Sequence, residues 1–259
     1  MELARRAGFV PALTWMALAY LLLPAFVVFP LSVTDTRYLA LPQHGISLNH
    51  WATFLSSSAW LGSVGQSLLI AVASTTIAVL CGTLCAIGCW KMTSHWAQVV
   101  RGLMLAPLIV PTIVYALALY RFYVDLRLLD TYTGIIIAHA VTGLPYVVIT
   151  VTAAISNFDP RLEQASRNLG ASTGQTLRMV IIPNLAPGIV SGAIFAFVHS
   201  WDELIIVLFV ASRRVVTLPR MIWSGINESL DPVIAVVAAI LICITLLLLV
   251  PIMRLRDKA

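Results

Sequence analysis

Six long apolar runs most constrain what this chain can fold into. A helix needs about 20 mainly apolar residues to cross a bilayer, and its backbone polar groups must be paired within the lipid. All but one of the runs have roughly the length of a single crossing. The sequence therefore predicts an all-α membrane protein with six transmembrane helices. The predicted spans are about 9–32, 64–90, 99–122, 133–156, 180–211 and 232–253.

The composition supports this class. Of the 259 residues, 60% are hydrophobic and 10% are charged, whereas soluble domains carry about 25% charged residues. The net charge of +5 comes from basic residues spread over separate short loops, which does not indicate nucleic-acid binding. We expect membrane lipid around the chain and no nucleic-acid partner.

The distribution of basic residues predicts the orientation. If the N-terminus is cytoplasmic, ten of the 16 Lys and Arg residues fall on the cytoplasmic side and six on the other side. Cytoplasmic loops usually carry such an excess of basic residues. We therefore expect both termini to be cytoplasmic.

Prolines and aromatic residues interrupt the third and fourth runs. Pro107 and Pro111 lie four residues apart and predict a bend. Tyr115, Tyr120 and Tyr123 follow them, either as interfacial aromatic residues or as part of a pathway lining. The GLPY sequence at Gly143–Tyr146 predicts a second kink, and His139 lies in the same run without a partner that the sequence identifies.

A polar segment, residues 159–179, separates the fourth and fifth runs. Its sequence is DPRLEQASRNLGASTGQTLRM. Asp159 followed by Pro160 predicts the start of a short amphipathic helix, and Gly170 predicts its end. A second short helix is predicted over Ser172–Val180. We interpret the segment as a helix–turn–helix on the cytoplasmic surface, where a groove on a soluble partner can bind its apolar face.

The spacing of this segment resembles the EAA loop of the membrane subunits of bacterial ABC importers. That motif reads Glu-Ala-Ala, three residues, Gly, nine residues, Ile, any residue, Leu, Pro. Two departures matter, because Gln164 stands in place of the Glu and Ser166 in place of the second Ala. Glu163 lies one position earlier, where many relatives carry an extra acid. The corresponding positions in this chain are Gln164, Ala165, Ser166, Gly170, Val180, Ile182 and Pro183.

The resemblance extends over nearly the whole chain. The stretches LPYVVITVTAAISNFDPRLEQASRNLGAS and FVHSWDELIIVLFV are similar to the spermidine/putrescine-type permeases of these importers. This implies the type I ABC importer permease fold, with residues 1–259 as one transmembrane domain in the bacterial inner membrane. It also implies three kinds of partner: a second permease in a heterodimer, two copies of a cytoplasmic ATPase subunit, and a periplasmic substrate-binding protein. The residues implied in coupling to the ATPase are Glu163, Gln164, Ala165, Ser166, Gly170 and Pro183.

Motifs for nucleotide binding and catalysis are absent from the sequence. No G-x-x-x-x-G-K-[ST] occurs, so ATP and Mg²⁺ are expected on the partner ATPase and no cofactor is expected in this chain. No H-E-x-x-H or comparable catalytic cluster occurs either. We therefore do not expect an enzyme.

Two adjacent acids, Asp202 and Glu203, interrupt the fifth run. A charge at the middle of a bilayer costs ~2.5–3.5 kcal/mol, so these acids must face a cavity, pair with a cation or lie at the outer edge. Successive helical residues point about 100° apart, so both acids reach one ligand only if the helix breaks there. Three interpretations are open. The acids can belong to an outer loop, line a pathway for a cationic cargo with Trp201 adding cation–π attraction, or bind a metal together with His199.

The sequence and the resemblance together predict a transport function. The chain would form half of the translocation pathway for a polyamine such as spermidine or putrescine, or for a similar small cationic solute. Trp201, Asp202 and Glu203 would line this pathway. One alternative is an ABC permease for another small solute, such as an amino acid derivative or a metal ion. Another is a stand-alone secondary transporter, which would need internal repeats that the sequence does not show.

Overall fold

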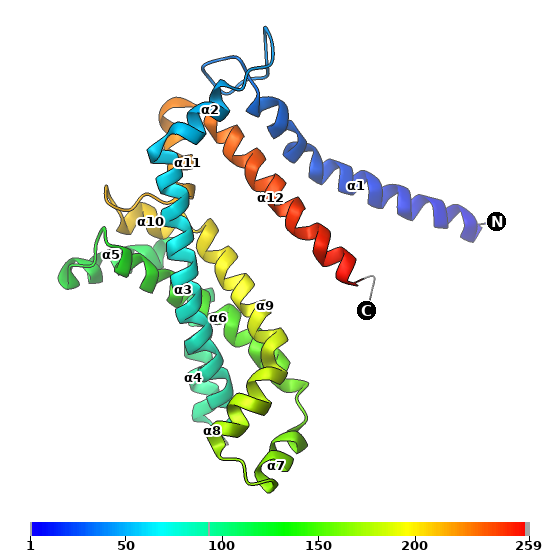
Figure 1. The fold of residues 1–259 in the computed structure, drawn as a ribbon, viewed down its shortest axis with the longest axis vertical. Helices are drawn as coiled ribbons and strands as arrows, with labels where there is room; N and C mark the ends of the chain where they lie inside the picture. Colours follow the sequence, from blue (N-terminus) through cyan, green and yellow to red (C-terminus); the bar gives the residue numbers. More distant parts are fainter. Residues whose placement is uncertain (1, 93, 257–259) are drawn as a thin grey trace. The chain divides into compact units, whose positions relative to one another are not determined.

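The computed structural model describes residues 2–92 and 94–256, and all regular elements in these ranges are helical (Figure 1). The absence of strands there confirms the predicted all-α class. In chain order the elements are α1 (Glu2–Ser32), α2 (Asn49–Ser56), α3 (Ser58–Lys91), α4 (Trp96–Leu105), the 3-10 turn η1 (Ala106–Leu108), α5 (Thr112–Leu126), α6 (Tyr132–Ser156), α7 (Pro160–Asn168), α8 (Thr173–Thr176), the π-helical turn η2 (Leu177–Ile181), α9 (Ile182–Asp202), α10 (Ile205–Val210), α11 (Leu218–Ser224), the π-helical turn η3 (Gly225–Ser229) and α12 (Val233–Arg256).

The chain forms two compact units. The first comprises Met1–Gly62 and Met221–Ala259, and the second comprises Ser63–Arg220. Within the first unit, α12 contacts both α1 and α2. The second unit contains most of α3 and all of α4–α10, and so it holds both the polar segment and the two adjacent acids.

Several helices are long and apolar enough to cross a membrane. In the part of the chain that the structure describes, four qualify by themselves, and the pair Trp96–Leu108 and Thr112–Leu126 gives a fifth if it is counted as one broken span. Within α12, Val233–Leu247 is a shorter apolar helix. The membrane class is supported, while the number six remains a prediction. The four helices are Pro11–Ser32, Ser58–Lys91, Tyr132–Ser156 and Thr173–Asp202.

Two of the predicted spans are broken. The third, 99–122, bends by 99° between η1 and α5, which confirms a bend at Pro107 and Pro111 but makes it far sharper than a kink. The fifth, 180–211, ends at Asp202 and is followed by the separate helix α10. Glu203 lies at this second break, where its backbone is extended and its Oε1 accepts a hydrogen bond from Ile206 N at 3.0 Å.

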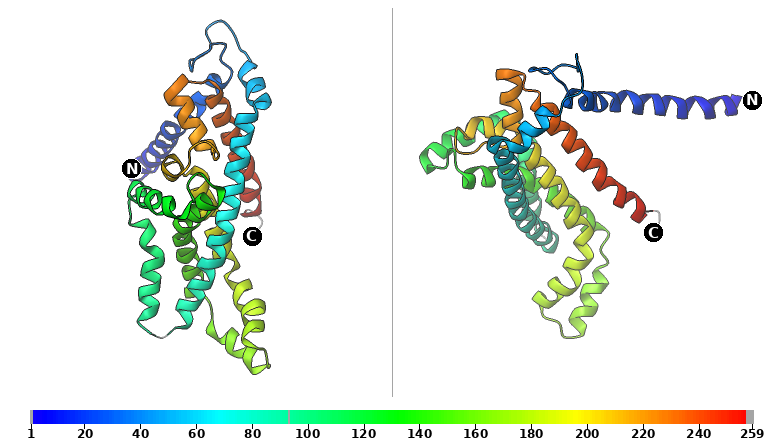
Figure 2. Two further views of the ribbon diagram at one scale, coloured as in Figure 1. Left: turned by 90° about the vertical axis from the view of Figure 1, so that its left-hand side faces the viewer. Right: turned by 45° about the horizontal axis from the view of Figure 1, so that its top comes forward.

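Helices α6 and α9 pack closely along their length (Figures 1 and 2). Glycines make this approach possible. A Cβ atom on Gly192 would lie 2.5 Å from Thr150 Oγ1 and 2.9 Å from Val147 Cα, and one on Gly188 would lie 2.6 Å from Ala154 Cβ. These glycines have the G-x-x-x-G spacing that brings membrane helices together.

The carboxylate of Asp130 fixes the backbone that follows α10 through hydrogen bonds. Asp130, between α5 and α6, accepts hydrogen bonds from the backbone N–H groups of residues 212–215 at 2.8–3.2 Å. Partial burial acts to raise the pKa of Asp130, but these N–H groups outweigh it and lower the pKa to about 2. The resulting stabilisation is complete above the usual Asp pKa of about 4 and is lost only as the pH falls toward 2.

Candidate functional site

The polar segment begins with the predicted cap. Asp159 Oδ1 accepts a hydrogen bond from Arg161 N at 2.9 Å, and Pro160 occupies the first turn of α7. The helix ends before Gly170, whose φ of +86° lies in the left-handed region that glycine adopts without strain. Both predicted boundaries of this first helix are confirmed.

The second half of the segment differs from the prediction. Ser172 and Gln175 form a capping box at the start of α8, as expected for a helix start. The helix does not stop near Val180, however, because it continues through the π-helical turn η2 into α9. Ser166 of α7 lies 3.0 Å from Thr176 Oγ1 of α8, and Thr176 is fully buried. The two halves of the segment are thereby joined.

The predicted coupling residues have different surroundings. Gln164, Ala165 and Gly170 are exposed, as is Pro183 at the start of α9. Glu163 is different, because its carboxylate pairs with Lys91 at the end of α3 and with Arg167 Nη2 at 3.1 Å.

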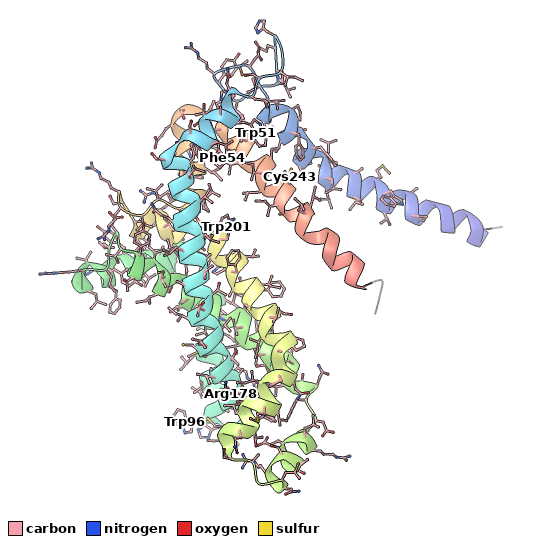
Figure 3. The ribbon with its side chains drawn as sticks, viewed as in Figure 1. Trp51, Phe54, Trp96, Arg178, Trp201 and Cys243 are labelled. Carbon is pink, nitrogen blue, oxygen red and sulfur yellow. The ribbon has the colours of Figure 1, made fainter. Side chains whose placement is uncertain are left out.

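Exposed apolar side chains lie on the same segment. Leu162, Leu169 and Met179 are 45%, 89% and 72% exposed. They lie among charged residues at one end of the second unit, where Arg178 is labelled in Figure 3. An apolar set with a polar rim is typical of a protein-binding surface.

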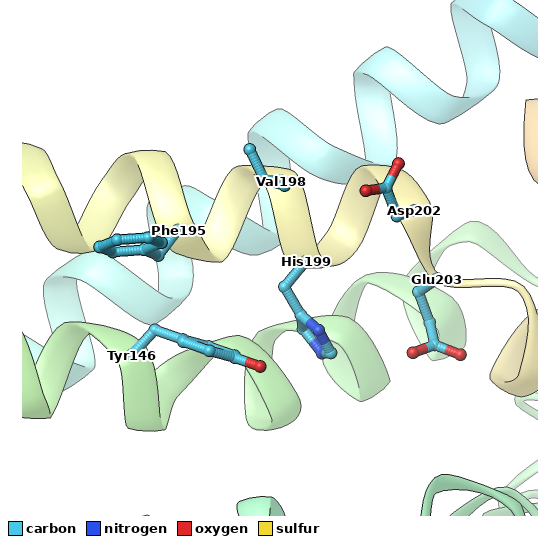
Figure 4. Close-up of a pocket in the computed structure, with 6 residues that line it drawn as sticks. All are labelled: Tyr146, Phe195, Val198, His199, Asp202 and Glu203. Atoms are coloured by element: carbon cyan, nitrogen blue, oxygen red, sulfur yellow. The ribbon is translucent and has the colours of Figure 1, made fainter. Parts of the chain in front are cut away.

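A cavity of about 280 Å³ lies between α6 and α9 (Figure 4). We call it the acidic cavity, because both adjacent acids line it. Each carboxylate points in its own direction from the end of α9, with His199 between α9 and α6. The lining residues are Tyr146, Phe195, Val198, His199, Asp202 and Glu203.

The two acids have different environments. Glu203 is buried, and its Oε1 caps the start of α10. Asp202 is exposed at the last residue of α9. The break in the helix after Asp202 allows both acids to line one cavity. From the sequence, such a break is required if both acids are to reach one ligand.

The aromatic rings that line the acidic cavity include those of Phe195 and of Tyr146. Tyr146 lies beside His199. Its ring lies 5.2 Å from the ring of His199, measured between centroids. Trp201, which is labelled in Figure 3, does not line this cavity and instead stacks on Phe197, with ring centroids 6.0 Å apart. From the sequence, Tyr146 is predicted only as part of a kink, although an aromatic residue beside a proline in a span could have marked it as a lining residue.

A buried chain of polar groups connects three helices beside the acidic cavity. His139 Nδ1 on α6 lies 2.8 Å from Ser200 Oγ on α9, and Ser200 Oγ lies 3.0 Å from Ser74 Oγ on α3. Ser200 is therefore the partner of His139 that sequence reasoning missed. The Nε2 atoms of His139 and His199 are buried without a hydrogen-bond partner.

A second cavity of about 120 Å³ adjoins the first. It shares Tyr146 and His199 with the acidic cavity, and Tyr115 and Thr142 add hydroxyl groups to its wall. Tyr115 thus lines a cavity, as in the pathway interpretation. Among residues 2–92 and 94–256, no group of three or more His, Cys, Asp or Glu side chains is placed to hold a metal ion.

Comparisons with known proteins place this geometry in context. Residues 78–258 match the family described as "Binding-protein-dependent transport system inner membrane component". The spermidine/putrescine transport system permease protein PotC of Haemophilus influenzae is 28% identical, over 92% of this chain and 93% of the relative. The trehalose transport system permease protein SugB of Mycobacterium tuberculosis is 30% identical, over 99% of this chain and 96% of the relative.

A solved structure also resembles this fold. It is the crystal structure of a bacterial ABC transporter involved in the import of the acidic polysaccharide alginate. The TM-score is 0.75 at 18% identity, and the match covers 98% of this chain and 97% of the other.

Proposed function

Because this chain belongs to the family of inner membrane components of binding-protein-dependent transport systems, we propose that it forms half of the translocation pathway for a polyamine or a similar small cationic solute. The chain is an ABC importer permease of the inner membrane. In the proposed topology it crosses the membrane six times, with both termini in the cytoplasm. It pairs with a second permease, two copies of an ATPase subunit and a periplasmic binding protein.

The acidic cavity carries the proposal. Asp202 and Glu203 line one small cavity with Tyr146, and an ammonium group can pair with the carboxylates while it faces the aromatic ring. Carboxylates at membrane depth are costly without a cation, so a cationic cargo gives them a role. The names of the PotC relatives support this class of cargo, whereas SugB shows that a similar chain is named for a sugar.

The polar segment supports the coupling part of the proposal. Leu162, Leu169 and Met179 offer apolar contacts to a groove on the ATPase, while Gln164 offers a polar contact. Glu163 is engaged within the chain, so its role in coupling is proposed to be indirect. ATP binding would displace this segment and open the pathway outward, and hydrolysis would reset it.

The test is uptake of labelled putrescine and spermidine by the complete importer in proteoliposomes. Asp202→Asn and Glu203→Gln remove one charge each, and the glutamine keeps an oxygen to cap α10. We expect the half-saturating polyamine concentration to rise by about tenfold or more in each variant, since hydrogen bonds to charged groups contribute strongly.

The matched control is Asp125→Asn, which neutralises an exposed acid of α5 that pairs with Arg121. It should leave uptake unchanged. Polyamine uptake that is insensitive to both cavity variants would contradict an acidic site. Uptake of trehalose but not of polyamines by the unmodified importer would replace the cationic cargo with a neutral one.

A further inference from the structure

We infer that Lys91 fastens the polar segment to α3, so that a displacement of this segment moves α3 together with α9. The inference rests on the proposed coupling of the segment to an ATPase. It assigns a positioning role to Lys91. Helix α3, like α9, would then transmit the displacement of the segment.

The first evidence is the contact at the end of α3. The Lys91 ammonium pairs with the carboxylate of Glu163, and the same ammonium lies 4.2 Å from the centroid of the Trp90 ring. Lys91 is thus held between an anion and an aromatic face. The Glu163 side chain is 13% exposed, so this pair is less screened by solvent than a fully exposed one.

A second contact reinforces the first. The rings of Trp90 and Phe158 meet edge to face, with centroids 5.6 Å apart and planes at 85°. Phe158 directly precedes the N-cap of α7, and Glu163 lies within that helix. Two neighbouring residues of α3 therefore hold both the entry and the first turns of α7. The hydrogen bond from Lys91, together with Arg167, lowers the pKa of Glu163, so the carboxylate stays charged at neutral pH.

Helices α3 and α9 also meet near the acidic cavity. The polar segment continues without interruption into α9, as the helix Thr173–Asp202. Ser74 of α3 meets Ser200 of α9 at 3.0 Å, and Lys91 lies about 25 Å along α3 from Ser74 at 1.5 Å per residue. Helix α3 is therefore joined directly to α9 at Ser200, and indirectly through α7 at Lys91. A displacement at the polar segment cannot move α9 alone while both joints hold.

The experiment measures whether α3 and α7 move together. Spin labels are placed at Gly88→Cys of α3 and Asn168→Cys of α7, which are both exposed, after the four native cysteines are replaced by serine. The complete importer is studied without nucleotide and after trapping with ATP and vanadate. We expect the distance between the labels to be the same in both states. In K91E this distance should change on trapping. The exchanged variant is K91E/E163K/R167E, in which Arg167 is also replaced because it would repel a lysine at position 163, and here the distance should again be the same in both states.

Transport per ATP hydrolysed is the second measurement. We expect K91E to lower it by about 2- to 30-fold, the range seen when coupling between sites is weakened, and the exchanged variant K91E/E163K/R167E to restore it. Arg121→Glu breaks an exposed pair on α5 and should leave the ratio unchanged.

Two outcomes would overturn the inference. One is a label distance that changes equally in the unmodified chain and in K91E. The other is an exchanged variant that restores neither measurement. The label distances need no polyamine, so a wrong cargo assignment leaves this test intact. By contrast, failure of the ATPase subunit to bind the unmodified permease would count against the proposed function.

Discussion

The polar segment and the acidic cavity are built in opposite ways. Contacts within a few residues shape most of the segment, including the caps at Asp159 and Ser172 and the left-handed Gly170. The cavity is shaped by α6 and α9, whose lining residues are separated by up to 57 positions, from Tyr146 to Glu203. A substitution in the segment should therefore impair coupling and spare the fold. A substitution in the frame of the cavity, by which we mean α6 and α9, should impair the fold itself.

The largest effect is expected where α6 and α9 approach each other most closely. Gly192→Ala would place a Cβ atom 2.5 Å from Thr150 Oγ1 and 2.9 Å from Val147 Cα. Overpacking of this kind costs about 1–3 kcal/mol or more, because backbone must move. We expect a lower unfolding temperature for the purified protein and less of it in the membrane.

The control for this prediction is Gly88→Ala on α3, where a Cβ atom has no neighbour within 4 Å. It should unfold at the temperature of the unmodified protein or slightly above it. Equal unfolding temperatures for Gly192→Ala and Gly88→Ala would show that the close approach of α6 and α9 is not what stabilises the fold.

An intermediate effect is expected at Ser200. Ser200→Ala removes the hydroxyl that lies between His139 and Ser74, so buried polar groups lose a partner at a cost of about 1–3 kcal/mol. The unfolding temperature should fall, by less than in Gly192→Ala. Ser191→Ala, on the exposed side of the same helix, is the matched control. Indistinguishable unfolding temperatures for the two serine variants would show that this polar chain does not stabilise the frame.

The smallest effect is expected within the polar segment. Ser166→Ala restores the alanine of the EAA motif but removes the contact with Thr176, which is worth about 0.5–1.5 kcal/mol. We expect polyamine uptake to fall by about two- to tenfold, with little change in unfolding temperature. The pair is measured as a double-mutant cycle with Thr176→Val. Additive losses would mean that the two hydroxyl groups do not act together.

Much of the segment was predictable because its determinants are local. Asp159, Pro160 and Gly170 each mark a helix boundary through their own chemistry, and the structure places the first helix between them. The missing stop near Val180 was not predictable in this way. The π-helical turn at Leu177–Ile181 keeps the helix continuous, and no local residue signals it.

The cavity was predictable only in part. The cost of adjacent acids in a span pointed to Asp202 and Glu203, and the helix break they require is present. The participation of Tyr146 and Ser200 depends on how α6 and α9 pack, which no short stretch of sequence determines. The spacing of Gly188 and Gly192 was the available signal for that packing.

The end of α9 at Asp202 has a consequence that does not depend on any side chain. A helix carries about half a negative charge at its C-terminus, from carbonyl groups without a partner in the helix. Because α9 ends at the wall of the acidic cavity, its backbone contributes negative potential there. This potential favours a cation by about 0.3–1 kcal/mol even without the two acids, and an anion would have to overcome it.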